Sequence, residues 1–203
     1  MRRALPVVLF VATLGCTASP TSPSLDDYGP IADFSFTERS GRTVTNADLA
    51  GKVWVASFVF TRCTGPCPQV TATVARIQKE LRNEPDVRLV TFTVDPAHDT
   101  PDELKEYAKH FGADPERWLF LTGPEEEIHR LSEKSFMFGV QRNTGKDVTP
   151  GTAVSHRTSL AVVDRRGHFR AYFDGRQVDD LGQPVDEVPK LCQAVAVLLR
   201  EKP

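Results

Sequence analysis

The sequence has almost no excess charge of either sign. Its 203 residues include 25 lysines and arginines and 27 aspartates and glutamates, which gives a formal net charge of −2. No basic stripe with interleaved aromatic side chains occurs, so we expect no nucleic-acid partner. Long apolar runs are also missing, because after residue 15 no run approaches the roughly 20 residues that a transmembrane helix needs. We therefore expect no membrane-spanning segment in the folded part of the chain.

The N-terminal residues 1–15 have the composition of an export signal. Two arginines precede an apolar run over residues 5–14, which is too short to span a bilayer. A small residue and then Cys16 follow, an order that indicates a lipoprotein cleavage site with Cys16 as the acylated N-terminus. Thr13 departs from this pattern, since leucine usually stands there, and an ordinary secretory signal is the alternative. Both interpretations predict an exported protein of the cell envelope or periplasm, and the first adds a lipid anchor in the membrane.

A tether separates this signal from the folded domain. Residues 16–30 are rich in serine, threonine and proline and have too few apolar side chains to fold alone. Residues 31–203 then form one domain, and their number is sufficient for an adequate hydrophobic core.

Strand and helix patterns alternate along this domain. Residues 53–60 are almost continuously apolar, as expected of a strand that is buried on both faces. From residue 68 apolar side chains recur at helical spacing. This order predicts an α/β fold, a thioredoxin-like three-layer sandwich with a central mixed sheet. The predicted strands are residues 33–36, 53–60, 87–94, 118–121, 158–163 and 168–173; the predicted helices start near residue 66, after a cap at Thr100, after a second cap at Thr122, and at residue 188.

Cysteine is scarce, with four residues in the chain. Without Cys16, the residues Cys63, Cys67 and Cys192 remain, and an odd number leaves at least one thiol without an internal disulfide partner. Cys192 lies in the predicted C-terminal helix, and we interpret it as a small buried apolar side chain.

Cys63 and Cys67 lie four residues apart, where the buried strand gives way to a helix. Exposed amides and the helix dipole stabilise a thiolate at a helix N-terminus, and a thiolate is both a nucleophile and a metal ligand. The pair therefore predicts either a redox-active dithiol that can form a disulfide or half of a soft-metal site. A static disulfide is the structural alternative, but so small a ring removes little chain entropy.

A histidine would complete a metal site of this kind. Two thiolates with an imidazole suit Cu(I) and can also hold Cu(II) or Zn(II). His98 follows the second long strand and His156 precedes a later one, and spacing alone does not choose between them. The other three histidines lie among charged residues on predicted helices or a strand, where we expect them to face solvent: His110, His129 and His168.

Several motifs extend this pattern along the chain. Residues 60–68 read Phe-Thr-Arg-Cys-Thr-Gly-Pro-Cys-Pro, residues 94–101 read Val-Asp-Pro-Ala-His-Asp-Thr-Pro, residues 118–123 read Trp-Leu-Phe-Leu-Thr-Gly, and a Ser-His pair at residues 155–156 precedes a strand. With these motifs in this order, roughly residues 30–199 resemble the Sco/SenC family. Its members are copper-binding proteins of thioredoxin fold that mature the binuclear copper centre of cytochrome c oxidase.

The resemblance implies that Cys63, Cys67 and His156 bind one copper ion, as Cu(I) or Cu(II). It also implies a metallochaperone that delivers copper to the oxidase, so the expected partner is the copper-accepting oxidase subunit or another copper carrier. A thiol reductant is a second expected partner, because an oxidising compartment favours the disulfide. Asp95 and Asp99 occupy the family's acidic motif. They either shape a turn and cap a helix, or lie behind the metal ligands or on a partner-facing acidic patch.

Two features depart from the family pattern. Arg62 adds a positive charge beside Cys63, which should favour the thiolates but oppose an incoming copper ion. The three residues between the cysteines are uncharged, whereas some relatives carry an acidic residue there. Both features leave the affinity and the preferred oxidation state of copper undetermined.

A thiol–disulfide oxidoreductase is the alternative function. Cys63 would then be the attacking thiolate and Cys67 the resolving thiol, without metal. A peroxidase of the peroxiredoxin type ranks below both, because its usual Thr-x-x-Cys motif is absent and Thr61 stands only two residues before Cys63. The main expectation is a metal-binding chaperone, and an additional reductase activity is left open by the sequence.

Overall fold

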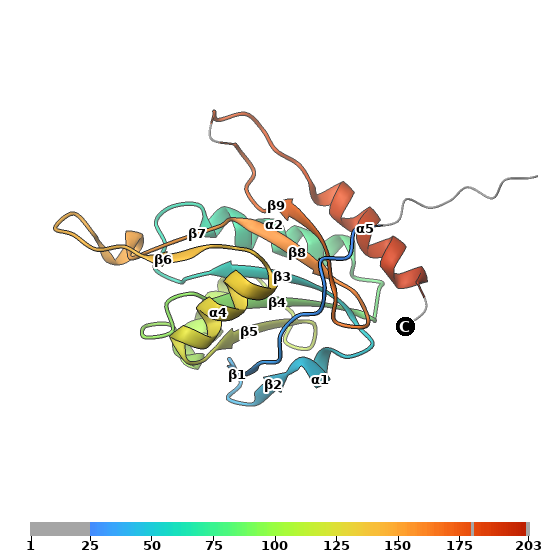
Figure 1. The fold of residues 1–203 in the computed structure, drawn as a ribbon. Helices are drawn as coiled ribbons and strands as arrows, with labels where there is room; N and C mark the ends of the chain where they lie inside the picture. Colours follow the sequence, from blue (N-terminus) through green and yellow to red (C-terminus); the bar gives the residue numbers. More distant parts are fainter. Residues whose placement is uncertain (1–24, 180, 202–203) are drawn as a thin grey trace, which may run out of the picture.

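The computed structural model describes residues 25–179 and 181–201 (Figure 1). The predicted signal, the predicted acylation site Cys16 and most of the tether lie outside the described residues. Among those residues, no helix is long and apolar enough to cross a membrane.

Seven strands form one mixed sheet, which confirms the predicted fold class. The central strands β3, β4 and β5 run parallel, and antiparallel strands flank them on both sides. The sheet order is β2-β1-β5-β4-β3-β8-β9. The strands are β1 (Ser35–Glu38), β2 (Thr43–Thr45), β3 (Val53–Val59), β4 (Val87–Thr93), β5 (Trp118–Thr122), β8 (Ser159–Val163) and β9 (Phe169–Asp174).

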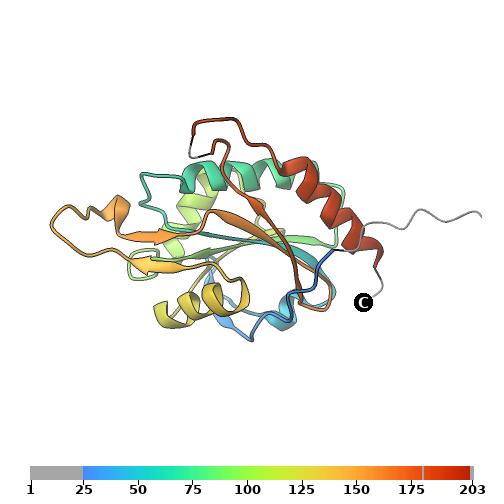
Figure 2. The same cartoon turned by 45° about the horizontal axis from the view of Figure 1, so that its top comes forward.

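Helices cover both faces of the sheet and complete the three layers (Figure 2). On one face lie α2 (Cys67–Glu80), α3 (Pro101–His110) and α5 (Val188–Arg200). On the other lie α4 (Glu125–Ser135) and the short α1 (Asn46–Leu49). This double cover explains why every side chain of β3 is buried and why its sequence is an apolar run rather than an alternation.

Aromatic side chains pack the layer between the sheet and α4. Phe58 on β3 and Phe92 on β4 stack with ring centroids 5.1 Å apart, and Phe136 at the end of α4 meets Phe58 edge-on at 5.4 Å. All three are buried. This packing fixes β3 and β4 relative to each other, and the carboxyl ends of these two strands carry the predicted site.

Three of the four predicted helix starts are correct, including that of α5 at Val188, and one is wrong. Cys67 is the first residue of α2, and the Thr100 side chain caps α3 by accepting a hydrogen bond from the Glu103 amide. The cap predicted at Thr122 is wrong, because that residue ends β5 and α4 begins only at Glu125, after a proline.

A hairpin that the sequence patterns did not predict projects from the sheet beside the start of α2 (Figures 1 and 2). It consists of β6 (Val140–Arg142), a 3₁₀ turn η1 (Pro150–Thr152) and β7 (Val154–His156). We call it the histidine hairpin, because His156 is the last residue of β7 and pairs with Val140. Both strands are only three residues long and mostly polar, so neither has the apolar alternation that predicts a strand.

Candidate metal centre

The loop that joins β3 to α2 carries Cys63, and Cys67 is the first residue of α2. We call residues 60–66 the cysteine loop. A turn closes over its middle, where the Cys63 amide donates to the Phe60 carbonyl at 3.2 Å. Cys63 is partly buried in this loop, whereas Cys67 in the first turn of α2 is fully buried. Both are free thiols, so the structure describes the reduced pair.

The two cysteines differ in pKa, which is lowered for Cys63 and raised for Cys67. The hydrogen bond that Cys67 donates lowers the pKa of Cys63 to about 6, and the amides of Cys67 and Gly65 add to this effect against the opposing effect of burial. The pKa of Cys67 is raised, by the same hydrogen bond, by burial and by repulsion from the Cys63 charge. At neutral pH Cys63 is therefore the thiolate and Cys67 keeps its proton.

His156 reaches this pair from the histidine hairpin. Its Nε2 lies 3.2 Å from Cys67 Sγ, and its Nδ1 lies 3.0 Å from the Arg157 carbonyl oxygen. Because a carbonyl only accepts, Nδ1 carries the proton and donates it. Burial lowers the pKa of His156, so the ring is neutral and the Nε2 lone pair faces Cys67. This is the form in which histidine binds a metal, with its other nitrogen held by a backbone carbonyl.

A hollow of 260 Å³ gives solvent access to this region between the cysteine loop and the histidine hairpin. Among the described residues, no three of histidine, cysteine, aspartate and glutamate form a ready-made metal cluster. The imidazole contacts Cys67, and the Cys67 thiol in turn donates a hydrogen bond to Cys63. The three predicted ligands thus contact one another in the order His156, Cys67, Cys63. His156 and Cys63 must move closer together before all three can bind one ion.

The donor set fits a soft cation. Two sulfurs and one imidazole nitrogen suit Cu(I) and also serve Cu(II) or Zn(II). Only the Cys67 proton must leave before all three groups can bind, because Cys63 is ionised and the Nε2 lone pair is free. Metal binding should therefore release about one proton near neutral pH.

The other candidate histidine lies away from the two sulfurs. His98 Nδ1 contacts Asp99 Oδ1 at 3.1 Å rather than a sulfur. Of the three histidines expected to face solvent, only His110 is exposed. His129 is partly buried and bonds the Val94 carbonyl oxygen at 3.1 Å, and His168 bonds the Asp27 carboxylate at 2.9 Å. That expectation was therefore wrong for the last two.

Asp99 is buried behind the cysteine loop. Its carboxylate accepts hydrogen bonds from the Thr61 amide at 3.0 Å and from the hydroxyls of Thr61 and Thr93 at 2.5 Å each. Since Thr61 opens the loop two residues before Cys63, Asp99 fixes where the loop leaves β3. Asp99 is 0% exposed, so its partners are all within the protein.

Asp95 is also buried, and it joins two segments. Its carboxylate accepts from Arg62 in the cysteine loop at 2.7 Å and from Arg142 in β6 at 3.2 Å. Burial would raise the pKa of Asp95, but the hydrogen bonds from these arginines hold it below its usual value. The Arg62 charge is thus directed at Asp95.

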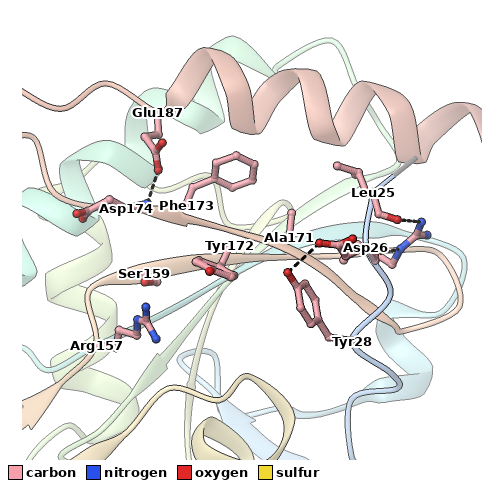
Figure 3. Close-up of a pocket in the computed structure, with 11 residues that line it drawn as sticks. Leu25, Asp26, Tyr28, Arg157, Ser159, Ala171, Tyr172, Phe173, Asp174 and Glu187 are labelled. Atoms are coloured by element: carbon pink, nitrogen blue, oxygen red, sulfur yellow. Dashed lines mark hydrogen bonds between the residues drawn. The ribbon is translucent and has the colours of Figure 1, made fainter. Parts of the chain in front are cut away.

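A larger hollow of 590 Å³ lies on β8 and β9 at the base of the histidine hairpin (Figure 3). The Arg157 guanidinium sits over the Tyr172 ring there, 5.5 Å from its centroid. No cysteine lines this hollow, so it is separate from the sulfurs. Cys192 is also remote from the pair; it is partly buried in α5, where burial raises its pKa.

Comparison with known proteins gives concordant matches. The SCO1/SenC family profile matches residues 25–190. The SCO1 protein homolog of Bacillus subtilis (strain 168) is 35% identical over 147 residues, which are 71% of this chain and 74% of that protein.

Solved structures match over most of the chain. A SCO1/SenC family lipoprotein from Bacillus anthracis str. Ames is 32% identical with a TM-score of 0.72, covering 83% of this chain and 94% of that one. BsSco, described as a member of the Sco family of cytochrome c oxidase assembly proteins, is 28% identical with a TM-score of 0.72, covering 89% and 100%. Yeast Sco1 with copper bound is 26% identical with a TM-score of 0.64, covering 89% and 92%. On its sequence and its fold, this chain belongs to the SCO1/SenC family.

Proposed function

We propose that this protein is a copper metallochaperone for the binuclear copper centre of cytochrome c oxidase. The contact of His156 Nε2 with Cys67 Sγ at 3.2 Å carries the proposal, because it joins an imidazole to a dithiol whose outer member is ionised. The copper bound to yeast Sco1 and the oxidase-assembly role given for BsSco support it.

The residues suggest how copper is accepted and passed on. The Cys63 thiolate and His156 both line the solvent-accessible hollow, so an incoming ion meets these two ligands before the buried Cys67. Cys67 then loses its proton, and the Nε2 lone pair of His156 completes three ligands. A three-ligand site leaves a position for a ligand from the acceptor, which favours exchange over storage.

The proposed location follows from the N-terminal sequence. We infer that Cys16 is acylated and anchors the domain to a membrane outside the cytoplasm, and a relative described as a lipoprotein supports this. In such an oxidising compartment Cys63 and Cys67 tend to form a disulfide. A thiol reductant is therefore needed before copper is loaded.

The difference in pKa between Cys63 and Cys67 favours a second candidate function, that of a thiol–disulfide oxidoreductase. The Cys63 thiolate would attack a partner disulfide, form a mixed disulfide and release one partner thiolate. Cys67, after losing its proton, would attack the Cys63 sulfur and release the second. The protein would end as the disulfide and the partner as the dithiol, so two electrons pass to the partner.

Anaerobic copper titration of the reduced protein separates the two functions. The wild type and the exposed control His110→Ala should bind one copper per chain, with sulfur-to-copper charge-transfer absorption in the Cu(II) form. His156→Ala should lose that absorption and keep any disulfide reductase turnover. An absence of stoichiometric copper in the wild type, with reductase turnover, would reject the chaperone.

A further inference from the structure

Two contacts hold the histidine hairpin against the cysteine loop. We propose that Arg142 and Gly151 are positioning residues, which set the approach of His156 to Cys67 through these contacts. The proposal deepens the copper site and rests on the proposed function only where copper is the probe. Neither residue belongs to the predicted ligand set.

The first contact is the buried Asp95 carboxylate. Arg142 lies opposite Val154 in the hairpin, and its Nη2 donates to Asp95 at 3.2 Å while its Nε donates to Glu125 at 2.8 Å. Asp95 is 1% exposed and also accepts from Arg62 at 2.7 Å. One carboxylate thus connects both segments of the site. If Arg142 is removed, Asp95 keeps Arg62, so the loss falls mainly on the hairpin.

The second contact is a close backbone approach at Gly151. The Thr64 amide donates to the Gly151 carbonyl at 3.2 Å. A Cβ added to Gly151 would lie 2.5 Å from Thr64 Cγ2 and 2.7 Å from Thr64 Oγ1, and 3.1 Å from the Arg62 carbonyl oxygen. Its φ is not in the left-handed region, so space rather than backbone conformation requires glycine. A side chain there must displace the Thr64 side chain, and its tight approach to the Arg62 backbone carbonyl pushes the hairpin away from the loop beside Cys63.

Internal hydrogen bonds make the hairpin move as a unit. The Asn143 amide nitrogen donates to the Thr152 carbonyl at 2.6 Å and to the Ser155 hydroxyl at 2.9 Å. These bonds cross from the β6 side to the β7 side. A displacement at Gly151 is therefore passed to β7, and with it to His156.

The chain offers matched variants for a test. Gly151→Ala should displace the hairpin, whereas Gly139→Ala is the control, because a Cβ there meets nothing within 4 Å and its φ is ordinary. Thr64→Ala removes both close atoms, so the double variant Thr64→Ala/Gly151→Ala should recover. Arg142→Ala removes the other contact, and Arg142→Lys keeps the charge but can meet only one of its two partners.

Two readouts on the full chain report site geometry rather than stability. In the reduced, metal-free protein, nuclear Overhauser contacts between the His156 and Phe60 rings, whose centroids are 6.1 Å apart, should weaken in Gly151→Ala and Arg142→Ala. They should return in the double variant and in part in Arg142→Lys. With copper as the probe, affinity should fall about 10- to 100-fold in the first two variants and stay unchanged in Gly139→Ala.

Several outcomes would overturn the inference. Wild-type ring contacts and copper affinity in Gly151→Ala and Arg142→Ala, with only a lower melting temperature, would make the two residues merely structural. Failure of Thr64→Ala to relieve Gly151→Ala would also count against it. If Gly151→Ala does not fold, the comparison of Arg142→Ala with Arg142→Lys tests the inference instead. If the wild type binds no copper, the proposed function fails, but the ring contacts of the metal-free variants still decide this inference.

Discussion

Cys67 Sγ and His156 Nε2 lie 3.2 Å apart although 89 residues separate them in the chain. Cys67 belongs to the first turn of α2 and His156 to the end of β7, so the contact depends on how that helix start and the hairpin meet beyond the carboxyl end of β3. The Arg157 carbonyl fixes the Nδ1 proton and turns the Nε2 lone pair toward the sulfur. The metal-free protein thus holds an imidazole and a thiol side by side, as the proposed copper site requires.

Cys63 should react as a thiolate at low pH. Its pKa is about 6, so the rate of its alkylation by iodoacetamide in the reduced, metal-free protein should rise through a midpoint near pH 6. Cys67, with a raised pKa and a buried sulfur, should stay unmodified over the same range. Mass spectrometry of the labelled peptides measures each site. A Cys63 midpoint above pH 8 would contradict the shared-proton arrangement.

Asp99→Asn should destabilise the fold around the cysteine loop. The amide nitrogen of asparagine cannot accept from Thr61 or Thr93, so at least one buried donor loses its partner. We expect the free energy of unfolding in urea to fall by about 1–3 kcal/mol. The exposed Asp102→Asn on α3 is the control and should change little. Equal stability of the two variants would show that these hydrogen bonds do not anchor the loop.

Acid should destabilise the protein through its buried carboxylates. Asp164 is 4% exposed; burial would raise its pKa, but the His168 amide and Arg170 hold it below its usual value. A lowered folded-state pKa contributes stability above the unfolded-state value and loses it as the pH falls through the folded one. The free energy of unfolding should therefore drop below about pH 4. Asp164→Asn should be less stable at pH 7 but should lose less on acidification, and an equal loss would contradict this role.

Much of the fold follows from local patterns in the sequence. The apolar run of β3 and the helical spacing after Cys67 predict a covered strand that leads into a helix, and the structure has both. Thr100 and Pro101 predict the start of α3, because the chemistry of a cap is local. At Thr122 the same pattern fails, since β5 extends through that residue and Pro124 sets the helix start.

The site depends on contacts that no local pattern carries. His98 and His156 are equivalent by spacing, and only the family resemblance distinguishes them. The histidine hairpin has short polar strands, so its pairing, the Arg142 contact with Asp95 and the close approach of Gly151 to Thr64 come from tertiary packing alone. A signal for Gly151 exists only after the structure shows which atoms a Cβ would meet.

X-ray absorption of the copper-loaded protein tests the central claim most directly. Two sulfurs and an imidazole nitrogen should surround the copper, because the account predicts that Cys63, Cys67 and His156 all bind the same ion. The imidazole signal should disappear in His156→Ala and persist in His110→Ala. A shell with fewer than two sulfurs, or an imidazole signal that survives in His156→Ala, would contradict the account.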